Sequence, residues 1–249
     1  MNYAIILAGG VGSRVGAGIP KQFVEVQGKP VLVYTLEIFQ QNPEIDAIEV
    51  VCHETYVGYL NVLIWKYNLT KVRWVTLGGE TFQESCMNGI HYLADKINRD
   101  DMIVIHYGAA PFTTQEMVSD AIRVCREKGN AVCGIPCFQL MGTRDRHENG
   151  EQSEKWVDRD QYIQITSPYA FNYGFVLDLY REAEEKDLLD KVEPHTTTLM
   201  QYMGHHLNLS YGDQTNIKIT TKEDIDIFEG YVLMKQLKEG KLKIEKKEI

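Results

Sequence analysis

The sequence predicts an α/β fold with a mixed, largely parallel sheet that helices cover on both faces. Short runs rich in valine and isoleucine, of the length of buried strands, alternate with longer amphipathic stretches. Strands that alternate with helices favour a parallel sheet. The chain has 249 residues, 44% of them hydrophobic, which suits one large soluble domain. We expect that domain to occupy residues 1–235.

The expected elements follow one another along the chain. Strands are predicted at Tyr3–Leu7, Ala47–Cys52, Val72–Thr76, Met102–Ile105 and Ala131–Ile135. Helices are predicted between them at Val31–Phe39, Tyr56–Trp65, Phe82–Leu93 and Glu116–Arg126. Later signals lie at Phe175–Glu184, Leu207–Leu209, Ile217–Ile219 and Glu223–Leu237. Sheets of this kind bind ligands beyond the carboxyl ends of their strands.

Two segments lack the apolar pattern of a core. Residues 138–162 are polar and charged and contain the turn signal Asn149-Gly150. Because so few apolar residues cannot form a core, we expect a loop or a projecting arm there. Residues 236–249 are rich in lysine and glutamate, and we expect a solvated tail.

Charge and cysteine content narrow the function classes. The formal net charge is -9, which argues against a general nucleic-acid or membrane-surface binder, although a nucleotide needs only a few local cations. The cysteines are odd in number, contain no CxxC pair, and lie at positions 52, 86, 125, 133 and 137. The apolar run at the N-terminus ends at Gly9, too short for the core of a signal peptide. We therefore expect buried reduced thiols and a cytoplasmic protein.

The loop after the first predicted strand carries the clearest chemical signal. Gly9, Gly10 and Gly12 remove side chains, so that backbone N–H groups can turn inward around phosphate oxygens. Arg14 and Lys21 add positive charge where a triphosphate would lie. The loop therefore predicts a phosphate-binding site.

Other glycine loops fit this segment less well. A Walker loop needs GxxxxGK[ST], and Lys21 lies too far along the chain. The dinucleotide pattern GxGxxG would need a third glycine where Val15 stands, which disfavours a Rossmann oxidoreductase. A plain glycine turn between a strand and a helix stays an alternative at this point.

The run from Leu7 to Arg14, followed by Pro20-Lys21-Gln22-Phe23, resembles the start of a sugar-phosphate nucleotidyltransferase. More narrowly, it is similar to the cytidylyltransferases that make 4-diphosphocytidyl-2-C-methylerythritol or CDP-ribitol. Further landmarks stand in family order: Gly78-Gly79…Ser85, His106…Pro111, Thr166-Ser167-Pro168…Phe171 and Asn216-Ile217-Lys218-Ile219-Thr220. The resemblance implies the Rossmann-like fold of the nucleotide-diphospho-sugar transferases, with a projecting arm that supports a homodimer.

The resemblance also implies a reaction, in which a phosphate monoester attacks the α-phosphorus of CTP and releases pyrophosphate. Negative charge gathers on the phosphoryl oxygens, so positioned cations stabilise the transition state. By resemblance Arg14 and Lys21 would neutralise the triphosphate, and Lys218 would bind the α-phosphate or the acceptor phosphate. The nucleotide would be lined by Ala8, Gly9, Gly10, Gly12, Gly78, Gly79 and Ser85.

The resemblance implies Mg²⁺ as well, but the segment expected to bind it is changed. The family segment reads His-Asp-Ala-x-Arg-Pro, so Tyr107 stands in place of the acid and Ala110 in place of the arginine. An un-ionised tyrosine is a poor ligand for a hard divalent cation. Thr215 replaces a second family acid, and Asp213 could substitute for it only through a register shift or a bulge. The protein ligand of the metal is left open, with a metal held by phosphates and water as one alternative.

Other family positions are changed too. The family has an arginine after the glycine pair where Phe82 stands here, and its acceptor-side pattern Arg-Asp-Thr aligns with Phe138 and Leu140. The family pattern Thr-Asp-Asp/Glu, which helps to build the pocket of the neighbouring subunit, aligns with the segment of His195. A site that loses such polar contacts discriminates against its former substrate, which disfavours methylerythritol phosphate. The resemblance implies transfer of CMP to a sugar or alditol phosphate, more ribitol 5-phosphate-like than methylerythritol phosphate-like, for a cell-surface polysaccharide or an isoprenoid precursor. A catalytically impaired nucleotide-binding relative with a regulatory role is the alternative.

Overall fold

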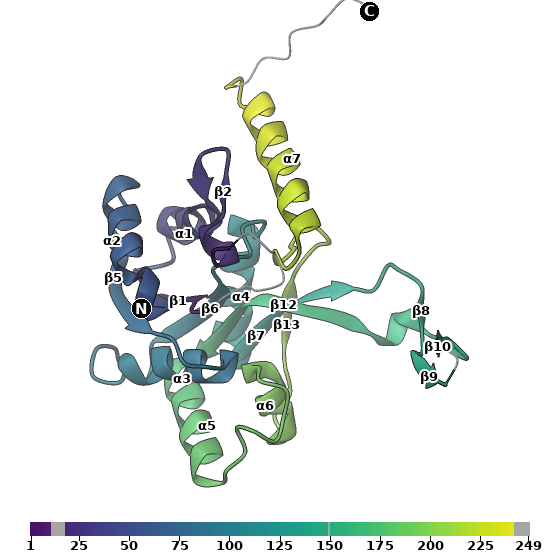
Figure 1. Cartoon of the computed structure of the whole chain (residues 1–249). Helices are drawn as coiled ribbons and strands as arrows, with labels where there is room; N and C mark the ends of the chain where they lie inside the picture. The colour runs from purple at the N-terminus through teal and green to yellow at the C-terminus, as the bar shows by residue number, and fades with distance from the viewer. Residues whose placement is uncertain (11–17, 149, 242–249) are drawn as a thin grey trace, which may run out of the picture.

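A seven-stranded sheet forms the centre of the computed structural model, which describes residues 1–10, 18–148 and 150–241 (Figure 1). Its order is β13-β7-β12-β6-β1-β4-β5. The strands are β1 (Asn2–Ala8), β4 (Ala47–Cys52), β5 (Val72–Leu77), β6 (Met102–Tyr107), β7 (Asn130–Pro136), β12 (Ile163–Asn172) and β13 (Leu209–Tyr211). Only β12 runs antiparallel to its neighbours in this sheet. The mixed, largely parallel sheet is thereby confirmed.

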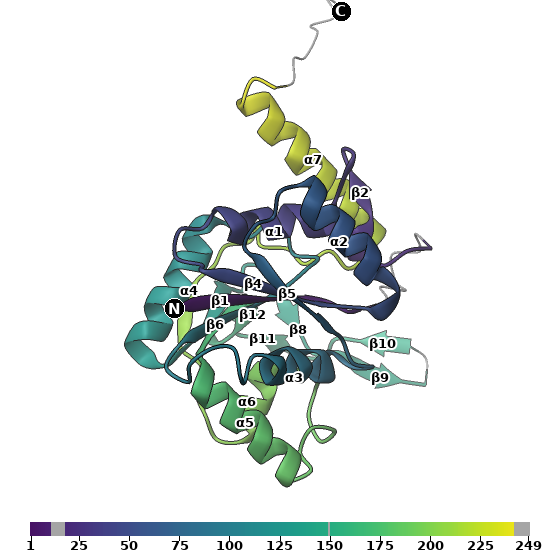
Figure 2. The same cartoon turned by 90° about the vertical axis from the view of Figure 1, so that its left-hand side faces the viewer.

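Helices cover both faces of the sheet (Figure 2). One face packs against α1 (Val31–Gln41), α2 (Val57–Lys66) and α4 (Gln115–Lys128). The other packs against α3 (Phe82–Tyr92), α5 (Tyr173–Glu185) and α6 (Thr196–Tyr202). Alternate residues of β1 enter the two cores, with Ile6 on the first face and Ile5 on the second. This two-sided burial explains why the predicted strands read as continuous apolar runs.

The starts of the helices follow their local chemistry. The side chain of Thr114 accepts a hydrogen bond from the backbone N–H of Met117 at 3.2 Å and begins α4, which Gly129 ends at φ +88°. Thr81 and Glu84 form a reciprocal capping box at the start of α3. These caps fix the first residues of α3 and α4, and so the place where each of these two helices begins.

The last helix, α7 (Lys222–Lys238), lies over a small hairpin (Figure 1). The hairpin is formed by β2 (Glu25–Val26) and β3 (Lys29–Pro30). Val26 of the hairpin and Phe228 of the helix share one apolar cluster. The helix includes the first residues of the expected tail, and residues 242–249 lie outside the described part of the chain. None of the helices described is both long and apolar enough to cross a bilayer.

The polar segment extends away from the sheet (Figure 1). It contains four short strands: β8 (Met141–Gly142), β9 (Asp145–His147), β10 (Gly150–Gln152) and β11 (Trp156–Val157). The pairs are β8 with β11 and β9 with β10, both antiparallel. We call residues 138–162 the arm.

Four parts of the chain differ from the predicted elements. Strand β12 was not predicted, because Pro168 lies inside it and proline argues against a central strand. The structure tolerates Pro168 through a register shift between Thr166 and Tyr169. Helix α6 was also missed. The signal at Leu207–Leu209 overlaps strand β13 only at its last residue. Residues Ile217–Ile219 form no strand; instead the N–H of Ile219 donates to the carbonyl of Ala109 at 2.8 Å.

Candidate active site

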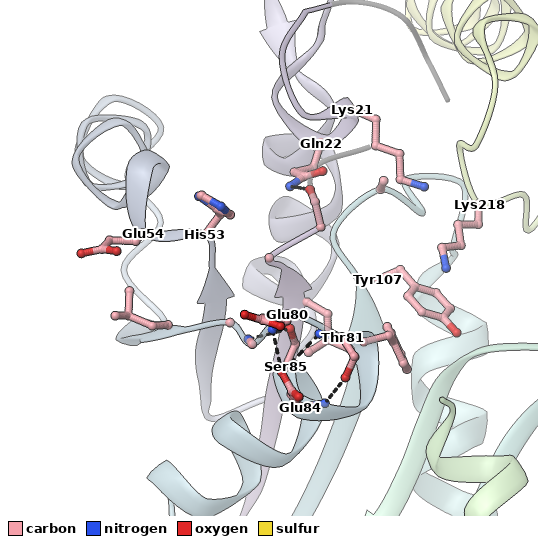
Figure 3. Close-up of a pocket in the computed structure, with 18 residues that line it drawn as sticks. Lys21, Gln22, His53, Glu54, Glu80, Thr81, Glu84, Ser85, Tyr107 and Lys218 are labelled. Atoms are coloured by element: carbon pink, nitrogen blue, oxygen red, sulfur yellow. Dashed lines mark hydrogen bonds between the residues drawn. The ribbon is translucent and has the colours of Figure 1, made fainter. Parts of the chain in front are cut away.

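A cavity of about 640 Å³ opens at the carboxyl ends of three parallel strands (Figure 3). Leu7 of β1, Leu77 of β5 and Tyr107 of β6 all line it. Small-molecule sites typically measure roughly 300–1,000 Å³, so one nucleotide fits this volume. The position agrees with the edge at which doubly wound sheets bind their ligands.

The first loop enters the cavity wall through Gly9 and Gly10. The side chain of Gln22 closes the loop, because its Nε2 donates to the carbonyl oxygens of Ala8 at 2.7 Å and Gly10 at 2.8 Å. Gln22 is buried, so these bonds are shielded from water. They tie the start of the loop, at Ala8 and Gly10, to the segment that carries Lys21, which lines the cavity.

The glycine pair after β5 packs directly against the first loop. A Cβ on Gly78 would lie 3.3 Å from Cα of Gly9, and a Cβ on Gly79 would lie only 2.3 Å from Cβ of Glu84. No side chain fits at Gly79 without moving the start of α3. The backbone N–H of Gly79 donates to Oγ of Ser85 at 3.1 Å. Ser85 itself lines the cavity, and its hydroxyl supports the glycine pair there.

Lys218 reaches the cavity from the segment between β13 and α7. Asn216, two residues earlier, is buried and anchors that segment. Its Nδ2 donates to the carbonyl of Ser167 at 2.8 Å, and its Oδ1 accepts from the hydroxyl of Thr113 at 2.7 Å. These bonds explain why an Asn precedes the lysine: the amide ties the backbone to two other segments and leaves Lys218 directed into the cavity.

The Lys218 ammonium lies over an aromatic cluster (Figure 3). Its Nζ is 3.5 Å from the centre of the Tyr107 ring. The hydroxyl of Tyr107 lies 3.0 Å from that of Tyr169 and 3.4 Å from Nδ1 of His195. The ring of Phe82 contacts those of Tyr107 and His195 at centroid distances of 5.4 and 4.8 Å. Burial raises the pKa of Tyr107 far above its ordinary value, so the phenol stays neutral.

The residues present do not fit a divalent cation held by the protein. Burial lowers the pKa of His106 to about 4, and its Nε2 donates to the carbonyl of Ala110 at 3.0 Å. Asp213 accepts from the backbone N–H of Thr215 at 2.7 Å, so it caps its own turn and does not line the cavity. Within residues 1–10, 18–148 and 150–241, no cluster of three His, Cys, Asp or Glu side chains could hold a metal ion.

The structure brings most of the predicted site residues to one cavity: Gly9, Gly10, Lys21, Gly78, Gly79, Ser85 and Lys218. Ala8 is buried and contributes its carbonyl to Gln22. Gly12 and Arg14 lie outside the described residues, so their assignments stay predictions. Figure 3 shows Lys21 and Lys218 on the same side of the cavity, with Glu54 on the opposite side.

Sequence reasoning missed the supporting roles of Gln22, Tyr169 and His195. The Pro-Lys-Gln motif marked Gln22, but nothing in the sequence showed that its amide folds back on the loop. Tyr169 and His195 are distant in sequence from Tyr107, and only the fold brings the three together.

Comparison with known proteins gives the family. The model of the family IspD, 2-C-methyl-D-erythritol 4-phosphate cytidylyltransferase, matches residues 2–234. The chain belongs to the IspD family. It is 38% identical to a ribitol-5-phosphate cytidylyltransferase of Lacticaseibacillus paracasei, over 94% of this chain and 99% of the relative. It is 33% identical to a 2-C-methyl-D-erythritol 4-phosphate cytidylyltransferase of Clostridium tetani, over 93% of this chain and 90% of the relative.

A solved structure supports the fold of this IspD-family chain. The 4-diphosphocytidyl-2C-methyl-D-erythritol synthase of Anaerococcus prevotii superposes with a TM-score of 0.76 at 24% identity. The match covers 93% of this chain and 96% of that one. Family membership confirms the predicted cytidylyltransferase class and excludes the Rossmann oxidoreductase alternative.

Proposed function

We propose that this IspD-family enzyme transfers CMP from CTP to an alditol phosphate, with ribitol 5-phosphate or a close analogue as acceptor. The observation that carries the proposal is the pair of lysines, Lys21 and Lys218, on one side of a nucleotide-sized cavity beside the glycine loop (Figure 3). The 38% identity to a ribitol-5-phosphate cytidylyltransferase supports the acceptor class. A CDP-alditol of this kind would serve a cell-surface polysaccharide.

The chemistry requires positioning and positive charge. An ionised oxygen of the acceptor phosphate attacks the α-phosphorus of CTP and forms a new P–O bond. The bond from the α-phosphorus to the bridging oxygen breaks, and pyrophosphate leaves with that oxygen and its electron pair. Lys21 and Lys218 would stabilise the negative charge on the α-phosphate and on the leaving group.

A divalent cation would reach this site with the nucleotide. Mg²⁺ usually keeps several water ligands and binds through substrate phosphates, and the described residues offer it no cluster of protein ligands. We therefore assign no reaction step to a protein-bound metal. The five cysteines are free thiols, four of them buried, which supports a cytoplasmic setting.

A pyrophosphate-release assay with paired nucleotides and acceptors tests the proposal. We expect turnover with CTP and ribitol 5-phosphate at a kcat/KM at least tenfold above that with 2-C-methyl-D-erythritol 4-phosphate, because Phe138 and Leu140 replace the polar acceptor contacts that the resemblance implies. UTP and ATP serve as nucleotide controls. Preference for methylerythritol phosphate would contradict the acceptor assignment. Selective CTP binding without turnover of any acceptor would favour the nucleotide-binding relative, which Tyr107 and Ala110 make the second candidate.

We also propose that the arm supports a homodimer. Leu140 is 92% exposed and Trp156 is 81% exposed, and both lie on the arm, away from the sheet (Figure 1). Exposed apolar side chains gathered on one projection are typical of an interface.

Light scattering coupled to size-exclusion chromatography tests this interface. The wild type should elute at about twice its chain mass, and the variant Leu140→Glu with Trp156→Glu should shift toward the monomer because charge opposes burial. The matched control is Trp65→Glu, an exposed tryptophan on α2. A wild type that is monomeric at all concentrations would contradict the assignment.

A further inference from the structure

Two aromatic rings form a corner around the Lys218 ammonium. Its Nζ lies 3.5 Å from the centre of the Tyr107 ring and 5.7 Å from the centre of the Phe82 ring. Both distances are within the roughly 6 Å over which a ring face attracts a cation. Two neutral rings therefore lie against the cation on two sides.

The orientation of the Tyr107 ring is itself fixed. Its hydroxyl is within hydrogen-bonding distance of Tyr169 on β12 and of His195 at the start of α6. The ring of Phe82, the first residue of α3, packs against its side. Residues from three separate elements thus fix the orientation of one ring. The face of that ring therefore offers the ammonium a preorganised binding position.

We propose that Tyr107 is a positioning residue that seats the Lys218 ammonium where the family pattern has a metal-binding carboxylate. The ammonium held there would supply positive charge to the substrate phosphates. A carboxylate at the same place would supply that charge indirectly, by binding a divalent cation. This inference rests on the proposed nucleotidyl transfer. A carboxylate selects a divalent cation through hard oxygen ligands, whereas a neutral ring attracts an ammonium without binding a metal.

NMR of the protein without substrate tests the seating directly. In protein labelled at lysine, the ε-methylene resonance of Lys218 is identified by its loss in Lys218→Met. We expect a ring-current shift to high field in the wild type and in Tyr107→Phe, and its loss in Tyr107→Leu. An unshifted wild-type resonance would overturn the proposal, and this readout needs neither activity nor a folded Tyr107→Leu variant.

Calorimetry with CTP in EDTA tests the consequence for binding. We expect Tyr107→Leu to weaken CTP binding about five- to thirtyfold, and Tyr107→Phe to remain within about threefold of the wild type. In the Lys218→Met background Tyr107→Leu should add no further loss. An equal loss in both backgrounds would show a general structural role and overturn the proposal. A wild type that does not bind CTP contradicts the proposed function, whereas the NMR result still decides the seating.

The variant Tyr107→Asp tests the exchange of one cation for another. It restores the family carboxylate beside Lys218, so Mg²⁺ should strengthen CTP binding at least tenfold more in the variant than in the wild type. Thermal unfolding of Tyr107→Asp checks that the variant is folded. An equal effect of Mg²⁺ on the two folded proteins would contradict the inference.

Discussion

Replacing Lys21 by alanine is expected to lower kcat/KM for CTP by at least about 100-fold while the protein stays folded. The removal of one positioned group that stabilises transition-state charge typically costs about 100- to 1,000-fold. Lys21 lines the cavity beside the glycine loop, whereas the neighbouring Gln22 makes the bonds that hold the loop. The substitution removes the charge, and the two hydrogen bonds from Gln22 to Ala8 and Gly10 stay in place. Pyrophosphate release measures the loss, and circular dichroism confirms the fold.

The matched control is Lys128→Ala, which removes an exposed lysine from the last turn of α4, outside the cavity. It should keep full turnover, which shows that the net charge of the chain is not the cause. Turnover of Lys21→Ala within threefold of the wild type would refute the role given to Lys21.

Replacing Glu49 by glutamine is expected to stabilise the protein at pH 8 by about 2 kcal/mol or more and to have little effect at pH 5. Glu49 lies in the middle of β4, fully buried, and its only partner among the described residues is the hydroxyl of Thr76, which donates to Oε1. Burial raises the pKa of this carboxyl to about 8. Gly89 of α3 packs beside this carboxyl, and a Cβ there would lie only 2.8 Å from Cγ2 of Val51.

The sign of the effect follows from the direction of that shift. Between the ordinary pKa of 4.5 and the folded value of about 8, the folded protein holds a proton that the unfolded chain has released. The free energy of unfolding therefore falls as the pH rises through this window, by up to about 1.4 kcal/mol per pH unit. The glutamine side chain stays neutral at every pH, so the variant Glu49→Gln lacks this decrease of the free energy of unfolding with pH. The lowered pKa of His106 adds a slope of opposite sign below pH 6.5, but it is present in both proteins and cancels in their difference.

Urea unfolding of the wild type and Glu49→Gln at several pH values from 5 to 8 measures the effect. The control is Glu25→Gln, an exposed carboxyl of β2, which should leave the pH dependence unchanged. Parallel curves for the wild type and Glu49→Gln would show that Glu49 is ionised in the folded protein at these pH values.

The sequence was sufficient for those parts of the fold that repeat a local pattern. Two-sided burial makes β1 and β4 continuous apolar runs, and glycines mark the loops that must approach each other closely at Gly9 and Gly78. Strand β12 escaped prediction because a proline inside a strand normally excludes it, and only the register shift at Thr166 resolves the conflict.

The aromatic cluster of the site escaped prediction for a different reason. Its members come from separate segments. In the sequence, each of them looks like an ordinary aromatic residue of the core. The departure of Tyr107 from the family pattern was visible in the sequence, but its meaning was not. That meaning depends on a distance of 3.5 Å to a lysine 111 positions away, which no local pattern encodes.

The antiparallel strand β12 has a consequence for how this architecture can change. Because β12 runs against β6 and β7, its amino end and the carboxyl end of β7 meet at the edge of the sheet that bears the cavity. The arm between them therefore begins at this edge, and none of its described residues lines the cavity. A longer, shorter or differently charged arm can be exchanged there while the seven strands keep their register. One reversed strand thus gives the fold a place where new partners can be added next to unchanged chemistry.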